Sequence, residues 1–459
     1  LEINTPLISP IADNAFNYYR YKLIGTFREG DKLINKIEVT PKRANDRIFQ
    51  GVIYIVEDDW QLYGVELTTT GAAIQVPFVE SLIFKHNFKY DSQTDLWVKI
   101  SQSIDFSFKL FGFGGNGRFT AVYSNYNFSP EFDRSTFTNE VLSFKPEANK
   151  KDSIFWNQIR PIPLTIEERS DYTLKDSIQE IRESKPYKDS VDRVQNTPGI
   201  LDPLLGYSYT NSYERWRVGY NGPLTTLNFN TVQGFNGTAG LFYNTWSENN
   251  TQATYANLNA NYGIDDDKLR FTSRIAKRFN RINNRTFAIE GGTKVQQFNA
   301  REPISNLVNS ISTLFWERNY IKLYELDYAR FSYSEELVNG LQLYANAGYE
   351  KRSPLFNTTD QVWIKNPVAY TSNNPLRPQD FNTPAIQTHE LAKLNARAVI
   401  NFGQKYMSYP DGKFNMNESK FPTLTLDLEQ TFAASDAAYN FTQVAAQLKQ
   451  EFDISNKGN

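Results

Sequence analysis

The feature that most constrains the fold is a series of long segments in which apolar and polar residues alternate. From residue 207 onward about ten such segments occur, many of them 9–13 residues long, including 253–262, 341–349, 389–402, 423–429 and 443–452. Alternation at period two places the apolar side chains on one face of a strand. Soluble strands average about 5–6 residues, whereas a tilted strand that crosses a bilayer needs about 9–11. These lengths predict antiparallel transmembrane β-barrel strands over residues 198–459.

Composition agrees with a barrel but also with a soluble all-β protein. Aromatic residues make up 15% of the chain, yet the mean hydropathy is −0.54, a mixture expected when strands face lipid on one side and a polar lumen on the other. No stretch approaches the roughly 18 apolar residues of a transmembrane helix. We therefore expect an all-β-dominated chain that crosses a membrane, if at all, with strands.

Charge and residue counts exclude several classes of function. The formal net charge of −2 gives no electrostatic case for nucleic acid. The absence of Cys excludes disulfides and thiolate metal sites, and two His residues leave little for a histidine metal centre. We predict no cofactor and no metal.

Residues 1–150 are predicted to form a periplasmic β-rich domain. Short segments rich in β-branched and aromatic residues are separated by turn residues, at 21–27, 36–43, 49–56, 60–67, 96–104 and 118–126. Segment 49–56 is apolar on both faces, so we expect it to be buried on both.

Residues 151–197 are predicted to form a helical, Pro-containing connector. The 160–163 segment interrupts regular structure, and Thr165 stands three residues before Glu168, the spacing of a capping box. Apolar residues follow at helical spacing, and Pro186 is expected to end a helix of about 20 residues.

The connectors and chain ends add two expectations. Short turns such as 264–267 alternate with long polar loops such as 353–388, which matches barrels with short periplasmic turns and long external loops. The chain begins with Leu1, and residues 455–459 are typical of a hairpin turn without a return strand. We expect both ends to be truncated and the barrel to be incomplete in this chain.

Several strings resemble an uncharacterised family of outer-membrane proteins from Bacteroidetes-type bacteria. These strings are 36–43, 49–67, 155–165, 175–178, 320–325, 349–355, 372–375 and 400–406. Members of that family carry a carboxypeptidase-regulatory-like (peptidase-associated) domain followed by a domain of unknown function. The resemblance runs from about residue 20 to the end. It implies an outer-membrane location, a non-catalytic regulatory-like domain ahead of this chain and further barrel strands after it, and it assigns no activity.

Four local patterns suggest chemistry, and each has a simpler interpretation. The 112–117 glycine run lacks the Lys-Ser/Thr of a phosphate loop, so a hairpin turn is favoured. The acidic runs 57–59 and 265–267 lack the staggered spacing of a calcium loop and are typical of turns. His389 and Glu390 are adjacent in sequence, but no Ser nearby carries the signature of a nucleophile. We predict no catalytic residue.

Aromatic and basic residues are the remaining candidates. Four tryptophans are interpreted as a membrane-interface girdle, with sugar stacking as the alternative: Trp216, Trp246, Trp316 and Trp363. Candidate lumen charges are Arg270, Arg274, Lys277 and Arg397, within a wider basic set that also includes Arg215, Arg217, Arg278 and Arg281. Arg274 and Lys277 lie on opposite faces of one strand. We favour pairing with Asp and Glu, or solvation, over an anion-selective wall.

These observations favour a non-enzymatic outer-membrane protein of the Gram-negative envelope, acting in assembly, export or surface-complex scaffolding. Its expected partners are outer-membrane lipid, lipopolysaccharide and envelope proteins that bind residues 1–150. A solute channel or receptor is the alternative, and a plug inside the barrel would count against a channel.

Overall fold

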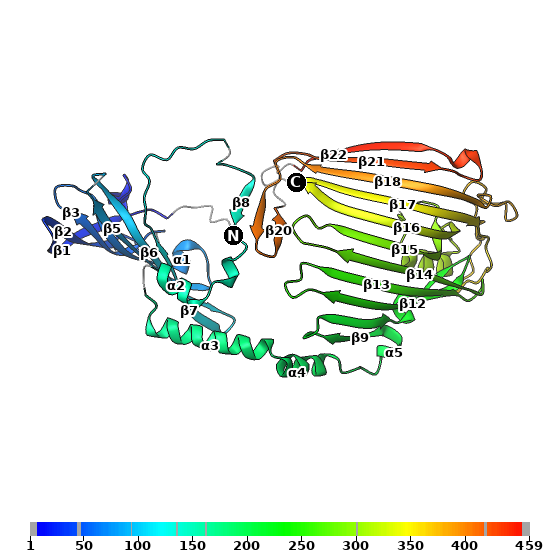
Figure 1. Cartoon of the computed structure of the whole chain (residues 1–459), viewed down its shortest axis with the longest axis horizontal. Coiled ribbons are helices and arrows are strands. Elements are labelled where there is room, and N and C mark those ends of the chain that lie inside the picture. Colours follow the sequence, from blue (N-terminus) through cyan, green and yellow to red (C-terminus); the bar gives the residue numbers. More distant parts are fainter. Residues whose placement is uncertain are drawn as a thin grey trace. The chain divides into compact units, whose positions relative to one another are not determined.

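The structure, a computed structural model, describes residues 7–43, 47–92, 94–134, 136–160, 163–299, 302–416 and 420–451. The chain forms two compact units, Leu1–Phe132 (unit 1) and Asp133–Asn459 (unit 2), and both are built mainly of antiparallel strands, as the alternating patterns predict (Figure 1). Among the residues just named, no helix is long and apolar enough to cross a membrane. The predicted turn at 455–459 lies outside the described residues.

Unit 1 is a seven-stranded antiparallel sheet whose strands follow one another in sequence order. The strands are β1 (Tyr19–Glu29), β2 (Lys32–Pro41), β3 (Gln50–Val56), β4 (Leu62–Thr70), β5 (Val79–Asp91), β6 (Leu96–Leu110) and β7 (Phe113–Val122), with short helices η1 (Ala15–Asn17) and α1 (Gly71–Ile74). All six predicted segments overlap strands of this sheet, although 118–126 runs past the end of β7 at Val122. Strand β5 was not predicted, because its three contiguous apolar residues, 82–84, run into a polar stretch that hides the alternation.

The core of unit 1 lies at its β1–β4 end. Tyr19, Val39, Ile53 and Leu67 are buried against one another and against the segment that precedes β1. Ile53 and Val56 have opposite parity in β3 and are both buried, so the prediction of burial on both faces holds for this part of the strand. The Tyr19 hydroxyl accepts a hydrogen bond from the Phe49 amide at 3.0 Å, which fixes the approach of the chain to β3.

The glycine run 112–117 forms a hairpin turn and the start of β7, as predicted. Phe111 and Gly112 have φ values of 49° and 85°, and β7 begins at the next residue. On β7 the glycines leave room for aromatic rings, since a Cβ on Gly117 would lie 2.2 Å from the Phe106 ring. The run therefore serves packing between β6 and β7.

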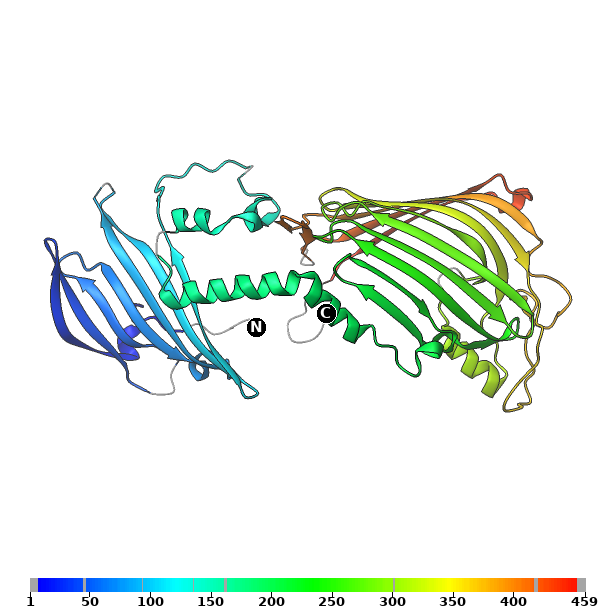
Figure 2. The ribbon, with the colours of Figure 1, turned by 60° about the horizontal axis from the view of Figure 1, so that its bottom comes forward.

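Unit 2 is dominated by an open twelve-stranded antiparallel sheet. Its order is β22-β21-β18-β17-β16-β15-β14-β13-β12-β10-β9, with β11 paired to β12. The bounds are β9 (Gly206–Asn211), β10 (Trp216–Asn221), β11 (Asn228–Asn230), β12 (Gly234–Trp246), β13 (Ala253–Gly263), β14 (Lys268–Arg278), β15 (Thr286–Gln297), β16 (Leu323–Val338), β17 (Leu341–Pro354), β18 (His389–Asn401), β21 (Thr423–Phe432) and β22 (Thr442–Lys449). Figure 2 shows that this sheet is curved. Within the described residues it does not close, and β9 and β22 are its two edges.

The helices of unit 2 confirm one predicted boundary and correct another. They are α2 (Ser153–Ile159), α3 (Ile166–Glu183), α4 (Lys185–Gln195), α5 (Asp202–Leu205) and α6 (Asn306–Trp316), with the short helices η2 (Ala148–Lys150), η3 (Pro223–Thr226) and η4 (Ala437–Tyr439). Thr165 and Glu168 form the predicted capping box at the start of α3. The prediction that Pro186 ends the helix was wrong: α3 ends at Glu183, and Pro186 stands in the first turn of α4, where its missing N–H costs no hydrogen bond.

The two longest connections between strands of the twelve-stranded sheet lie at the same end of that sheet. The β15–β16 connection, which contains α6, and the segment between β17 and β18 lie at this long-loop end, whereas the turns after β9, β12, β14 and β16 lie at the opposite, short-turn end. Turn 264–267 was expected among the short periplasmic turns, but strand direction places it at the long-loop end. Residues 225–232 alternate in polarity like a strand, yet they contain the end of η3 and the short β11.

A small sheet forms at the short-turn end. Its strands are β8 (Glu140–Ser143), β19 (Tyr406–Tyr409) and β20 (Gly412–Asn415), in the order β20-β19-β8. Lys413 on β20 contacts Glu336 on β16 at 2.6 Å, and both side chains are largely buried. This pair ties the β18–β21 connection to the main sheet.

Candidate functional site

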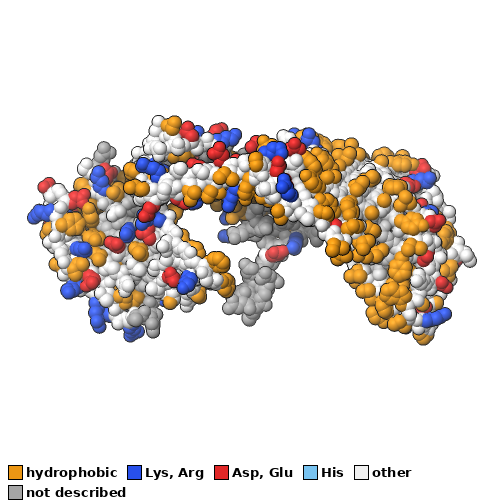
Figure 3. All heavy atoms as spheres, turned by 90° about the horizontal axis from the view of Figure 1, so that it is seen from below, with side chains coloured by type: hydrophobic (Ala, Val, Ile, Leu, Met, Phe, Trp, Pro, Cys, Tyr) orange, Lys and Arg blue, Asp and Glu red, His pale blue; other side chains and the backbone are white. Residues whose placement is uncertain are grey.

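The two faces of the twelve-stranded sheet differ sharply in polarity. One face, the polar face, carries Asn259, Arg274, Glu290, Arg330 and Glu350 along adjacent strands, because the register pairs them or places them at the same parity. The other, the apolar face, carries a series of exposed large side chains: Leu241 (59% exposed), Leu258 (46%), Ile275 (60%), Ile289 (66%) and Phe331 (44%). In Figure 3 hydrophobic side chains gather over the strands of unit 2.

A chain of ion pairs crosses the polar face from β14 to β17. Arg274 contacts Glu290 at 2.8 Å, and Arg330 joins Glu290 at 3.1 Å to Glu350 at 3.3 Å. Arg352 completes the series with a 2.6 Å contact to Glu350. Each carboxylate lies between two guanidinium groups, which compensates its burial. The charges on this face are therefore mutually neutralised to a large extent.

The chain of ion pairs continues beyond β17. On β18 and β21, Lys393 contacts Glu429 at 2.7 Å and Arg397 contacts Asp427 at 2.5 Å. The paired interpretation of the basic residues thus agrees with these contacts.

Arg270 lies where the backbone pairing between β14 and β15 stops, a gap that we call the seam. The ladder between these strands ends at Thr272 and Gly292, and beyond it the Arg270 side chain, 2% exposed, contacts Asp266 at 2.6 Å and Glu325 at 2.8 Å. Its Nη1 atom is buried and has no hydrogen-bond partner among the described residues. A charged side chain therefore takes the place of missing backbone pairing.

Helix α6 covers the polar face at the long-loop end. Ser305 caps it by accepting a hydrogen bond from the Val308 amide. Asn309, 1% exposed, donates to the Phe229 carbonyl and accepts from the Ile321 amide. These bonds fasten α6 between β11 and the start of β16. No prediction covered this helix, although Ser305 followed by Leu307, Val308, Ile311 and Leu314 carries a cap and helical spacing.

The predicted long loop packs on α6 through a buried polar network. Asn373 donates to the Leu323 and Leu355 carbonyls, and the Tyr370 hydroxyl donates to the carbonyl of Thr313 in α6. Burial raises the pKa of the Tyr370 hydroxyl. The part of the chain between β17 and β18 is therefore a packed layer rather than a free loop.

Lys322 lies under this layer, just before β16. Its Nζ donates to the Thr371 hydroxyl at 2.7 Å, and it forms no ion pair with a described carboxylate. Burial lowers the pKa of Lys322 from 10.5 to about 8, because a charged ammonium loses solvation there.

A pocket of about 420 Å³ lies on the polar face between α6 and strands β11–β16. Ten of its 21 described lining residues are Asn or Gln, among them Asn228, Asn230, Asn259, Asn261, Gln296 and Asn306. The remainder include Arg270, Lys294 and Tyr328. Such a surface presents many neutral donors and acceptors in a small volume.

The structure separates the four tryptophans. Trp216 on β10 lies on the apolar face at the short-turn end, where its ring stacks against Tyr209 at 5.8 Å and Tyr243 at 6.5 Å. Trp246 ends β12 at the same end but with the parity of the polar face. Trp316 ends α6, and Trp363 lies between β17 and β18 with its ring 5.1 Å from Phe315. The girdle interpretation stays a prediction.

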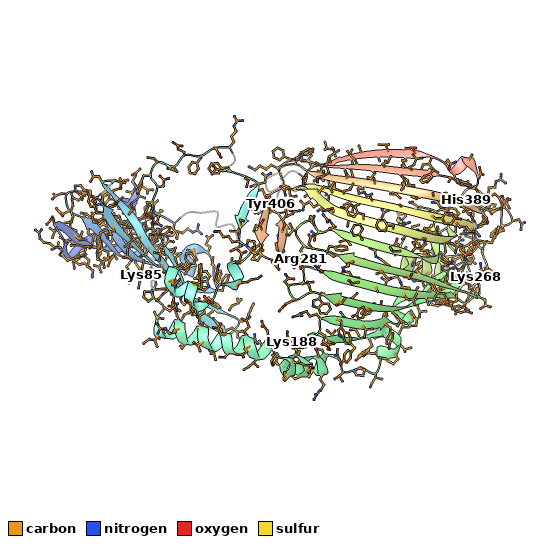
Figure 4. The ribbon with its side chains drawn as sticks, viewed as in Figure 1. Lys85, Lys188, Lys268, Arg281, His389 and Tyr406 are labelled. Carbon is orange, nitrogen blue, oxygen red and sulfur yellow. The ribbon has the colours of Figure 1, made fainter. Side chains whose placement is uncertain are left out.

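The basic candidates also separate. Arg270, Arg274 and Arg397 have the parity of the polar face, whereas Lys277 has the parity of the apolar face and lies 5.2 Å from the ring of Phe279. Nearer the turns, Arg215 contacts Glu248, Arg217 contacts Ser208, Arg278 contacts Asn250 and Arg281 contacts Asp411. Figure 4 shows Lys268 and His389 at one end of the sheet and Arg281 and Tyr406 at the other.

His389 and Glu390 do not form an acid–base pair. His389 is 2% exposed, its Nδ1 lies 2.8 Å from the Gln387 carbonyl, and its ring stacks on Tyr439 at 3.5 Å. Glu390 has the opposite parity in β18 and is exposed. His389 is therefore a buried packing residue stacked on Tyr439.

The acidic runs are turns. Asp59 contacts Lys32 at 2.7 Å, and Asp266 contacts Arg270. Over the described ranges, no group of three or more His, Cys, Asp or Glu side chains is arranged to hold a metal ion.

Two family models match this chain. The model described as "Family of unknown function (DUF5686)" matches residues 1–126, and the model of its C-terminal domain matches residues 201–459. The chain belongs to the DUF5686 family. The C-terminal DUF5686 domain contains the whole twelve-stranded sheet, its polar face and the amide-lined pocket, whereas α3 and α4 lie between the two matched regions. No carboxypeptidase-regulatory-like domain is among the matches. No curated protein and no solved structure matches the chain.

Proposed function

We propose that this DUF5686 protein is a non-enzymatic outer-membrane β-barrel protein of the Gram-negative envelope that acts in assembly, export or surface-complex scaffolding. The observation that carries the proposal is the polarity of the twelve-stranded sheet. On its apolar face the side chains of Leu241, Ile275 and Ile289 are more than half exposed. Its other face carries the chain of ion pairs. A soluble sheet buries its apolar face, whereas a barrel in lipid turns that face outward.

Strand length supports the same proposal. Strands β12 to β18 are 11–16 residues long, enough for a tilted crossing of the hydrocarbon core. Trp216, Tyr209 and Tyr243 form an aromatic cluster on the apolar face at one end. Aromatic side chains of this kind favour the level of the lipid head groups.

The connector supports an orientation with the short-turn end toward the periplasm. Asp192 of α4 accepts hydrogen bonds from the Ser212 amide and hydroxyl, and Asn196 accepts one from the Thr210 amide. Helix α4 is thus fastened to the short-turn end of β9, although the chain enters β9 at Gly206, toward the other end of that strand. Periplasmic turns of outer-membrane barrels are short. Unit 1 then belongs to the periplasm, where it would meet envelope partners.

The covered polar face favours scaffolding or export over a simple solute channel. Helix α6 and the segment between β17 and β18 pack on that face through Asn309, Tyr370 and Asn373. A channel needs a continuous polar path, and this layer occupies the long-loop end. A receptor remains the second candidate because the amide-lined pocket lies beside α6.

Neighbouring residues of β16 give a direct test in a chain without Cys. Phe331→Cys reports the apolar face and Ser332→Cys the polar face. Each variant is labelled with bimane and reconstituted in phosphatidylcholine vesicles with or without brominated acyl chains. We expect brominated lipid to quench the label at 331 strongly and the label at 332 little. Equal quenching at both positions, or none at 331, would contradict a membrane-spanning sheet.

A further inference from the structure

We propose that the amide-lined pocket of the DUF5686 C-terminal domain binds a carbohydrate segment that carries an acidic group. The pocket holds about 420 Å³, within the range of roughly 300–1,000 Å³ typical of small-molecule sites. The inference goes beyond the proposed function and does not depend on membrane insertion, because the pocket is formed by side chains of one sheet and one helix.

The lining selects a ligand rich in hydroxyl groups. Small-molecule pockets are usually lined mainly by apolar side chains, but ten of the 21 described residues here are Asn or Gln. An amide both donates and accepts hydrogen bonds, and so does each sugar hydroxyl. Most of these amides already form hydrogen bonds within the chain. An apolar ligand would leave the others unpaired, at a cost of about 1–3 kcal/mol for each one that it buries.

Some of these amides are available to a ligand. Asn259 on β13 and Asn306 on α6 form no side-chain hydrogen bond with the described part of the chain, although both line the pocket. By contrast, Asn309 uses its amide to hold α6 in place. The free amides therefore lie on two different elements that face one space.

Two cations in the lining point to an acidic group. Lys294 on β15 forms no ion pair with any described residue, and its Nζ lies 5.4 Å from the centre of the Tyr328 ring. Arg270 keeps a buried Nη1 atom without a described partner, although its other nitrogens bind Asp266 and Glu325. A carboxylate or sulfate on the ligand would gain charge-assisted hydrogen bonds from these nitrogens.

The tryptophans that were candidates for sugar stacking do not line this pocket. Recognition here would rest on amides and cations, with the half-buried Tyr328 ring beside Lys294. That arrangement selects by hydroxyl pattern and charge more than by a flat apolar sugar face.

The test uses the full chain in detergent and two matched probes, trigalacturonic acid and its methyl ester. They share every ring and hydroxyl and differ in charge. We expect saturable binding of both by calorimetry, with the acid bound about tenfold more tightly, a difference of roughly 1.4 kcal/mol. Lys294→Gln should remove that tenfold advantage and leave the affinity for the ester unchanged.

The matched control is Lys277→Gln, which removes a lysine from the opposite face of a neighbouring strand and should change neither affinity. Asn259→Asp, nearly isosteric, should weaken binding of the acid more than that of the ester, and it decides the matter if Lys294→Gln does not fold.

Absence of saturable binding of both probes would overturn the carbohydrate assignment. Equal affinities for acid and ester, or an equal loss in Lys277→Gln, would overturn the role of Lys294. Neither result would bear on the bimane test of membrane insertion, so the two proposals fail separately.

Discussion

Arg270 on β14 contacts Glu325 on β16 at 2.8 Å, although β15 lies between these strands in the sheet. The contact is feasible because the β14–β15 ladder ends at Thr272 and Gly292, where Gly292 has a φ of 135°. A Cβ at that glycine would lie 2.1 Å from the Phe271 carbonyl oxygen. The seam therefore depends on a residue without a side chain and on one buried cation.

We predict that Arg270→Gln strongly destabilises unit 2. The substitution leaves the buried Asp266 carboxylate without its cation and leaves Glu325 only the 3.4 Å contact with Lys268. Loss of one partner from a buried ion pair typically costs about 3–5 kcal/mol. Urea unfolding of the full chain in detergent, followed by tryptophan fluorescence, measures the change. Arg274→Gln is the control, because Arg274 is half-exposed and Arg330 still pairs with Glu290; its loss should be at most about 1 kcal/mol. Similar losses in both variants would contradict this account.

Gly51→Ala is expected to destabilise unit 1 by about 3 kcal/mol, the upper part of the range for overpacking. Gly51 has a φ of 146°, and a Cβ there would lie 2.1 Å from the Glu66 carbonyl oxygen in the neighbouring strand. Backbone on both sides prevents simple relief. Gly25→Ala on the edge strand β1 meets nothing within 4 Å and should not reduce stability. Urea unfolding of both variants measures these changes. An unfolding midpoint for Gly51→Ala equal to that of the unchanged protein would refute the prediction.

Unit 1 should lose stability in mild acid through His86. Burial, together with the nearby Lys99, lowers the pKa of His86 from 6.5, and its Nε2 has no described partner. Between the lowered pKa and 6.5 the unfolded chain binds more protons than the folded one, so stability rises with pH across that window. In His86→Asn the unfolding free energy should depend less on pH between about pH 5 and pH 7, roughly the range in which His titrates. Parallel pH profiles of the two proteins would count against the prediction.

Lys322 should produce a second dependence, in alkali. Its pKa is about 8 in the folded chain against 10.5 for an ordinary Lys, so between these values the unfolded chain binds the extra proton and stability rises with pH. Lys322→Met has no ammonium group at this position and so lacks this pH-dependent contribution to stability. We therefore expect the melting temperature of the unchanged protein to gain on that of the variant as the pH rises from about 8 to about 10. A constant difference across this range would show that Lys322 keeps its ordinary pKa.

Periodicity made the strands of unit 2 predictable. Alternation in 253–262 and 341–349 fixed both the existence of β13 and β17 and the residues on each face, because a strand turns successive side chains to opposite sides. The capping box at Thr165 and Glu168 was predictable for a similar reason, since a cap involves only residues three apart. Signals of this kind depend on neighbours along the chain.

Pairing across long separations was not predictable in the same way. Nothing local to Asp266, Arg270 or Lys294 indicates which partner each meets, and nothing near Asn259 indicates that α6 closes a pocket over it. Lys277 was a candidate lumen charge, but it has the parity of the apolar face. Alternation separates the two faces of a strand, but which face becomes the polar one depends on the whole sheet.

The sequence by itself thus determined the strands, their two unlike faces and the helix boundaries set by caps, since these follow from residues a few positions apart. The tertiary structure alone decided that turn 264–267 lies at the long-loop end, that Arg270 fills the seam and that α6 covers the polar face. The reason is physical: these features come from strand order, strand direction and contacts between residues far apart in the chain, such as Asn309 and Phe229, which are 80 positions apart. No local pattern encodes such contacts.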